Sequence, residues 1–405
     1  MKEQEKQVQL KSYNRRTVLN YIRRNQTATR AGLASVTGLT FMAIKKILEE
    51  LELLGLIRTD RKELCSTGRK ANSYAVNENY KYTVGIHINK YSTNIALLNL
   101  RGKILQIERH SMEQDFLNQS EFVELITGSV DRVIAQAGIG KEEVLGIGVG
   151  TPGPVDSRTG MILTPPNIPV LNYLPLKEIL EEKTALPVYV NKDTNVIALA
   201  EYWYGNAAGC DDLIYIDVDM GIGNGLILEG KVNTGANSTA GEFGHITIDV
   251  NGPLCNCGNR GCLEAMSSGI AVLRDMKEQL EKEPGHPLYG KRNSLTMKDV
   301  FEMVDQKDLL TISILNRSAF YLGVGVSSLI NIFDPQIIVL GGILIQNYPR
   351  YFSIVRDVAD ARKVKGAKEN KMVISAFKDD AGVIGAGEVV ADHFFEEGVN
   401  AVILK

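Results

Sequence analysis

Apolar residues recur at helical spacing in three short segments between Asn14 and Ile57. The recurring positions are Val18, Leu19 and Ile22 in the first segment, Leu33, Ala34 and Val36 in the second, and Ile44, Ile47, Leu48 and Leu51 in the third. Thr29 and Thr40 precede the second and third segments, where a hydroxyl group can cap a helix. Gly38 and Gly55 follow the same two segments, where glycine commonly ends a helix. The pattern predicts three helices, with a short turn between the second and the third.

Two extended stretches follow these helices, at residues 56–58 and 73–76. We expect them to pair as the wing of a winged helix-turn-helix domain over residues 1–80. The spacing of helix, short glycine turn and helix is typical of DNA-reading proteins of this kind.

Beyond Lys81 the pattern changes to that of an α/β fold. Residues 84–88 and 94–99 have the pattern of a strand hairpin, and residues 213–228 repeat that pattern about 130 residues later. A long helical pattern covers 309–332, and an apolar strand at 337–340 precedes Gly341 and Gly342. The repeated hairpins predict a duplicated α/β architecture of two lobes that face a cleft.

Charge separates the two parts of the chain. The 405 residues carry a net charge of −3. Residues 1–80 contain 15 Lys/Arg and 8 Asp/Glu, a net charge of +7, so the remainder carries −10. A basic segment on an acidic body indicates a polyanionic partner at one end, although clustering by chance gives the same count. The polar N-terminus and the absence of an apolar run near the roughly 20 residues of a membrane span indicate a cytoplasmic protein without a membrane partner.

One loop has the composition of a metal site. Gly-Glu-Phe-Gly-His at 241–245 is followed by Cys-Asn-Cys-Gly-Asn-Arg-Gly-Cys-Leu-Glu at 255–264. One imidazole and three thiolates, from His245, Cys255, Cys257 and Cys262, suit tetrahedral zinc and leave no open coordination position. We therefore expect structural Zn²⁺. The alternative is three loop cysteines and a histidine satisfied by other contacts.

Four further polar residues are candidates for ligand binding. Glu242 and Glu264 flank the cysteine loop and could accept hydrogen bonds from a polyol, or remain solvated surface acids. Asn167 lies in a proline-rich loop, where its amide suits sugar recognition but also a simple turn. Asp193 follows the apolar strand 188–190 and precedes a helix. Its carboxylate could bind or deprotonate a hydroxyl group, or cap that helix.

The order of these motifs resembles the ROK family of repressors and sugar kinases over nearly the whole chain. The motifs in question are the helix-turn-helix, Gly-Thr-Pro-Gly-Pro-Val-Asp at 150–156, the Asp193 segment, the 241–264 loop and Leu-Gly-Gly at 340–342. The resemblance implies an actin-like, hexokinase-like ATPase fold with a sugar between its lobes. The lobes would be 81–195, completed by a C-terminal helix at 383–398, and 196–382.

Carried to matching positions, the resemblance also implies the roles of single residues. The sugar contacts would be Asn167, Asp193, Glu242, His245 and Glu264, and Asp193 would be the catalytic base in the kinases. The zinc ligands would be His245, Cys255, Cys257 and Cys262.

The sequence departs from the family's kinases in both hairpins. Those kinases begin the first hairpin with an acidic residue and a Gly-Gly-Thr turn, whereas this chain has His87 and then Asn-Lys-Tyr at 89–91. In the second hairpin Asp219 and Met220 replace the Gly-Thr of a Gly-Thr-Gly-Ile-Gly pattern. Lys192 stands where an asparagine usually precedes the aspartate. Phosphoryl transfer depends on positioning and charge neutralisation, so we expect no ATP binding and no catalytic residue.

These observations favour a sugar-responsive DNA-binding repressor of carbohydrate genes. Two alternatives are an ATP-dependent sugar kinase with an added DNA-binding module and a DNA-binding protein without a small-molecule ligand. A partner set of operator duplex DNA and a sugar or sugar phosphate is expected, in a homodimer or homotetramer. The predicted DNA contacts are Thr40, Phe41, Met42, Lys45, Lys46, Arg69 and Lys70. The alternative is that the lysines form a solvated helix face.

Overall fold

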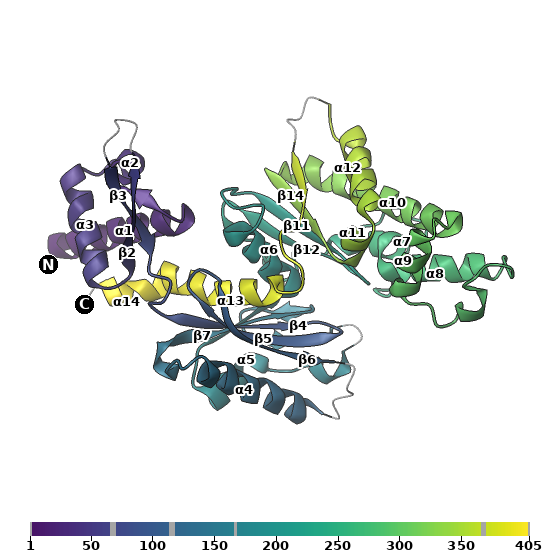
Figure 1. Ribbon diagram of the computed structural model, residues 1–405, viewed down its shortest axis with the longest axis horizontal. Coiled ribbons are helices and arrows are strands. Elements are labelled where there is room, and N and C mark those ends of the chain that lie inside the picture. Colours follow the sequence, from purple (N-terminus) through teal and green to yellow (C-terminus); the bar gives the residue numbers. More distant parts are fainter. Residues whose placement is uncertain (1, 65–69, 113–117, 166–167, 366–369, 404–405) are drawn as a thin grey trace. The chain divides into compact units, whose positions relative to one another are not determined.

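The computed structural model describes residues 2–64, 70–112, 118–165, 168–365 and 370–403. The chain divides into two compact units (Figure 1). Unit 1 contains Met1–Val196 and Asp380–Lys405, and unit 2 contains Ile197–Asp379. The C-terminal segment therefore belongs to the same unit as the N-terminal helices.

The three predicted N-terminal helices are α1 (Lys2–Arg24), α2 (Arg30–Thr37) and α3 (Phe41–Leu53). Both predicted caps are confirmed, because the hydroxyl groups of Thr29 and Thr40 accept hydrogen bonds from the backbone N–H groups of the first turns. Helix α1 begins much earlier than the apolar pattern indicates. Residues 2–13 are mostly lysine, glutamate and glutamine, which favour a helix without producing an apolar stripe.

The predicted pairing of the two extended stretches is also confirmed. Strands β2 (Ile57–Leu64) and β3 (Lys70–Val76) pair antiparallel, and the short strand β1 (Ala28–Thr29) adds to β3. Lys70 begins β3, and Arg69 lies outside the described residues. Helices α2 and α3 and this hairpin have the arrangement expected of a winged helix-turn-helix.

The rest of unit 1 is a five-stranded sheet of order β10-β7-β4-β5-β6. Its strands are β4 (Tyr82–Ile88), β5 (Ser92–Asn99), β6 (Ile104–Ser111), β7 (Val144–Thr151) and β10 (Val188–Lys192). The other elements in this part of unit 1 are α4 (Gln119–Gln136), η1 (Lys141–Glu143), β8 (Val155–Asp156), β9 (Met161–Ile162), η2 (Pro169–Leu171) and α5 (Leu176–Thr184). Helix α13 (Ala381–His393) packs on the sheet, and glycines at 85 and 148 allow this close approach because a Cβ there would clash with its backbone.

Unit 2 is built on a second five-stranded sheet, of order β13-β12-β11-β14-β15. Its strands are β11 (Leu213–Val218), β12 (Ile222–Leu228), β13 (Lys231–Val232), β14 (Ile337–Gly341) and β15 (Lys371–Ile374). The hairpin predicted at 213–228 is β11–β12, as the hairpin at 84–99 is β4–β5. Both sheets thus start from the same kind of hairpin, as the duplication predicts.

Unit 2 also contains helices, most of which pack with this sheet around one large apolar core. They are α6 (Asp193–Tyr204), whose first residues belong to unit 1, η3 (Phe243–His245), α7 (Leu263–Ser267), α8 (Gly269–Leu280), η4 (Tyr289–Lys291), α9 (Met297–Asp305), α10 (Leu309–Phe333), α11 (Ile343–Asn347) and α12 (Pro349–Arg362). Helix α10 is long and apolar enough to cross a membrane, but half of its most apolar window is buried and it packs on α12.

The N-terminal helices share a hydrophobic core with the end of the chain. The segment after α13 continues as η5 (Phe394–Gly398) and α14 (Val399–Ile403). The buried members of this core include Val18, Leu19, Ile22, Leu48, Leu51, Phe394, Phe395, Val399 and Ile403. Burial of this apolar surface joins the helix-turn-helix to the helix that lies on the first sheet.

A buried ion pair reinforces this shared core. The Arg23 guanidinium at the end of α1 pairs with Glu388 and, at 2.8 Å, with Asp392, both on α13. The side chains of Arg23 and Glu388 are only 7% and 2% exposed. The guanidinium also lies 4.3 Å from the centre of the Phe395 ring. Charges withdrawn from water require their partners, so this pair fixes α1 against α13.

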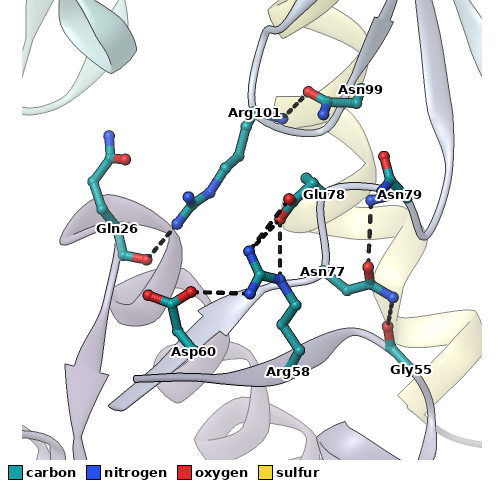
Figure 2. A network of polar contacts seen from close by, with 9 residues as sticks. All are labelled: Gln26, Gly55, Arg58, Asp60, Asn77, Glu78, Asn79, Asn99 and Arg101. Atoms are coloured by element: carbon teal, nitrogen blue, oxygen red, sulfur yellow. Dashed lines mark hydrogen bonds and ion pairs between the residues drawn. The ribbon is translucent and has the colours of Figure 1, made fainter. Parts of the chain in front are cut away.

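A second polar network joins the wing to the first sheet (Figure 2). Arg58 on β2 donates hydrogen bonds to Glu78 at 2.9 Å and to Asp60 at 2.9 Å. The backbone carbonyl of Glu78 accepts from Leu100, which follows β5, at 3.0 Å. Arg101 donates to the Gln26 carbonyl, just after α1, at 2.8 Å. The segment between β3 and β4, which contains Glu78, is therefore hydrogen-bonded both to strand β2 and to the residue that follows β5.

We predict that Glu388→Gln lowers the free energy of unfolding of unit 1 by about 2–4 kcal/mol, because it leaves a buried guanidinium short of one carboxylate. Asp380→Asn is the control, since it removes the Arg109–Asp380 pair, whose side chains are 50% and 40% exposed. That change should cost less than about 1 kcal/mol. Chemical denaturation of the whole chain measures both, with amide exchange in α1 identifying the unit 1 transition. Equal losses in the two variants would contradict the role of the buried pair.

Candidate metal centre and ligand site

The structure brings the four predicted metal ligands together in unit 2. The Nδ1 atom of His245 lies 3.7 Å from Sγ of Cys255, and the Sγ atoms of Cys257 and Cys262 are 3.6 Å apart. All four ligand atoms lie within 4.8 Å of one another. A tetrahedral ion with metal–sulfur bonds of about 2.3 Å separates its ligands by about 3.7 Å. The group could therefore hold a metal ion of this geometry.

The loop that carries these ligands depends on two glycines. Gly258 and Gly261 have φ angles of 94° and 63°, which glycine adopts without strain. A Cβ at Gly261 would also clash with the carbonyl oxygen of Asp249. The cysteines differ in environment: burial raises the pKa of Cys262 to about 12, whereas a hydrogen bond from the Asn259 backbone lowers the pKa of Cys257. A bound cation would replace both thiol protons.

Glu264 connects this loop to the second hairpin. Its Oε2 atom accepts a hydrogen bond from the backbone N–H of Ile222 at 3.1 Å, and its Oε1 atom lies 4.0 Å from Sγ of Cys255. Nearby, the buried side chain of Asn224 accepts from the backbone N–H of Phe243 at 3.1 Å. The metal loop and the β11–β12 hairpin therefore form one assembly.

Two backbone donors in the turn of the second hairpin are satisfied within the turn itself. The N–H of Asp219 donates to the Gly221 carbonyl at 3.0 Å, and the N–H of Met220 donates to the Asp219 carboxylate at 2.6 Å. The first N–H groups of α8, at Gly269 and Ile270, donate to the carbonyls of Asp219 and Met220. Backbone donors that could otherwise face a phosphate group are used inside the protein.

The turn of the first hairpin, between β4 and β5, is closed in a similar way. The side-chain oxygen of Asn89 accepts from the backbone N–H groups of Tyr91 and Ser92, each at 2.8 Å. This is an Asx turn, in which the side-chain oxygen takes the place of a backbone acceptor. An asparagine three residues before a strand is a recognisable signal, although the sequence pattern did not single it out for this role.

His87, on β4 just before this turn, is buried. Its ring packs against Gly382 at the start of α13, and its Nδ1 atom has no hydrogen-bond partner within the described chain. Burial lowers the pKa of His87 to about 4, so the ring is neutral near pH 7. A neutral ring thus occupies the position at which, by the resemblance described above, the kinases of the family have an acidic residue.

Asp193 lies where the sequence predicts, directly after β10 and as the first residue of α6. Its carboxylate accepts from the adjacent N–H of Thr194 at 2.6 Å. Asp193 belongs to unit 1, whereas Glu242, His245 and Glu264 belong to unit 2. Asn167 lies outside the described residues. Within unit 2, His245 and Glu264 both contact Cys255, while Glu242 is exposed three residues before His245.

The predicted DNA-contact residues of α3 lie at its surface. Thr40, Phe41, Met42 and Lys46 are exposed, and Lys45 is half-buried with its ammonium group 3.7 Å from Glu49. The opposite face of α3 is buried in the shared core.

Comparison with known proteins relates this chain to both repressors and kinases. A xylose repressor of Bacillus subtilis is 27% identical over 391 residues, which covers 96% of this chain and 97% of that protein. A glucokinase of Halalkalibacterium halodurans is 32% identical, covering 76% of this chain and 95% of the glucokinase. The crystal structure of a ROK family transcriptional regulator, a homologue of the Escherichia coli MLC protein, has a TM-score of 0.80 and 26% identity, covering 98% of this chain and 99% of that one.

These likenesses differ in the part of the chain that they include. About a quarter of this chain has no counterpart in the glucokinase, whereas the xylose repressor matches nearly the whole length of this chain. The sequence profile of the ROK family matches residues 83–393, which comprise both sheets and α13. This chain therefore belongs to the ROK family.

Proposed function

We propose that this chain is a DNA-binding transcriptional repressor that responds to a sugar or sugar phosphate and does not transfer phosphate. The observation that carries the proposal is the shared core of the helix-turn-helix and α13, since α13 also packs on the sheet of the ROK fold. Likeness to a xylose repressor over 96% of the chain supports the same function.

The DNA-binding surface would be the exposed side of α3. A helix-turn-helix places its second helix in the major groove with its N-terminal residues at the base edges. Thr40, Phe41 and Met42 would lie at those edges, and Lys45 and Lys46 would reach phosphate groups. Arg69 and Lys70, next to the wing, would contact phosphate or the minor groove. Two such domains in a homodimer, or four in a tetramer, would read a palindromic operator.

The sugar contacts would be the residues that the family resemblance implies at matching positions: Asp193, Glu242, His245, Glu264 and Asn167. Carboxylates and amides are suitable partners for sugar hydroxyl groups. Glu264 would keep one oxygen on the Ile222 N–H, as in this structure, and offer the other to the ligand. Ligand binding would then act directly on the β11–β12 hairpin, which precedes the metal loop in the chain.

Loss of phosphoryl transfer is supported by the two hairpin turns. A nucleotide phosphate needs free backbone donors and neutralising charge at these turns. Here the donors are used by Asn89, the Asp219 carboxylate and Glu264, and the Asp219 carboxylate would repel a phosphate group. The alternative, an ATP-dependent sugar kinase, is supported by the presence of Asp193 and by the likeness to a glucokinase over 76% of the chain.

The metal would be Zn²⁺ in a structural role. Four protein ligands close the coordination sphere and leave no position for a substrate. His245 would bind the ion through Nδ1, the atom that faces Cys255, and present its other nitrogen to the sugar. The ion would thereby hold His245 and Glu264 in place for the ligand.

We predict that the purified protein contains one zinc ion per chain and that Cys257→Ser loses it. Because structural zinc contributes folding free energy, the midpoint temperature of unit 2 should fall by several degrees. Cys210→Ser is the matched control, since Cys210 is a free cysteine outside the cluster. Elemental analysis and thermal unfolding measure both effects. Zinc-free protein of unchanged stability would refute the metal assignment.

We also predict that a panel of sugars and sugar phosphates contains a compound that raises the thermal midpoint without being phosphorylated when ATP is added. Asp193→Ala should abolish the shift, because it removes a hydroxyl acceptor, whereas Asp131→Ala, an exposed acid on α4, should not. A coupled ADP-release assay on the same samples tests for turnover. Steady ADP formation with the stabilising sugar would instead establish a kinase.

A further inference from the structure

The first turn of α3 presents two large apolar side chains to solvent. Phe41 is 54% exposed and Met42 is 69% exposed, whereas Ile44, Ile47, Leu48 and Leu51 of the same helix are buried. The exposed pair is therefore separate from the apolar face that packs the core. Val36, in the last turn of α2 before the glycine turn, is also 59% exposed.

The same turn offers little hydrogen-bonding capacity to a partner. Phe41, Met42, Ala43 and Ile44 have no polar side-chain atoms, and the Thr40 hydroxyl oxygen already accepts from the Ala43 N–H at 3.2 Å. Positive charge begins one helical turn later, at Lys45 and Lys46, four residues after Phe41 and Met42. The first turn of α3 can therefore contact a partner mainly through apolar side chains.

The charge around this tip identifies the kind of partner. Residues 1–80 carry a net charge of +7, and the two lysines lie directly behind the apolar pair. A polyanion with apolar groups at its surface fits this arrangement better than an apolar protein surface does. In the major groove of B-DNA the apolar group is the 5-methyl group of thymine.

We propose that Phe41 and Met42 recognise thymine methyl groups, so that each operator half-site carries thymines where the tip of α3 meets the groove. This inference rests on the proposed DNA-binding function and specifies how that function selects its sequence. Lys45 and Lys46 supply affinity through phosphate contacts without reading the sequence. Burial of one methyl group changes affinity about fourfold, so two methyl groups change it about 15-fold.

The test uses the full-length protein and a pool of random 24-base-pair duplexes. The enriched duplex is resynthesised with each dT replaced in turn by dU, which lacks the methyl group but keeps the same hydrogen-bonding groups. At the contacted positions we expect about a fourfold loss for each replacement, with an unchanged dependence on salt concentration. The salt dependence reports phosphate contacts and serves as an internal reference.

Two protein variants complete the experiment. Phe41→Ala with Met42→Ala should bind the dT and dU duplexes equally, and both side chains are exposed enough for the change to leave folding intact. Lys46→Ala is the matched control from the next turn. It should weaken binding to both duplexes and reduce the salt dependence while keeping the ratio of dT to dU affinity.

Each contrary outcome has a distinct meaning. If an enriched duplex binds equally well with dT and dU, the thymine inference is wrong while DNA binding stands. If no duplex is enriched and binding does not depend on salt, the proposed function fails and the inference fails with it. If the Phe41 and Met42 changes leave DNA affinity intact but alter the oligomeric state, the apolar pair is a contact between copies of the chain and the inference is also wrong.

Discussion

The Arg23–Glu388 ion pair and the apolar core around it are the contact on which unit 1 depends. They join the last turn of α1 to the middle of α13, across most of the length of the chain. Because a buried guanidinium cannot easily exchange its carboxylate for water, the contact favours one arrangement of the two helices. The N-terminal helices α1 to α3 are consequently part of the same packed body as the first sheet. A displacement of α13 would have to be followed by α1, and through it by α2 and α3.

The ROK fold is retained here while its two hairpin turns have become closed on themselves. The repeated hairpins, the glycines that admit α13 and the metal loop are all present. Within the turns, however, Asn89 and Asp219 provide from their side chains the acceptors that a bound phosphate would otherwise provide. A fold does not by itself determine an activity, and we propose that these few side chains distinguish this chain from the kinases of the family.

Local features of the sequence predicted much of this structure. The caps at Thr29 and Thr40 depend on residues three positions apart, and the metal ligands gather because a short loop carries them. The core between residues 18–22 and 394–403 could not be predicted, because no local pattern indicates which distant apolar faces meet. The length of α1 was also missed, since its polar first half has no apolar stripe. The division into three domains and the roles of Asn167 and Arg69 stay predictions.

The central claim is that sugar and operator DNA bind to coupled sites on one chain. The most direct measurement is a pair of titrations on the full-length protein: duplex affinity with and without saturating sugar, and sugar affinity with and without saturating duplex. Coupling between sites is reciprocal, so we predict that both affinities change by the same factor, on the order of 5–150-fold. A sugar that binds tightly and leaves the affinity for the duplex unchanged would contradict the account.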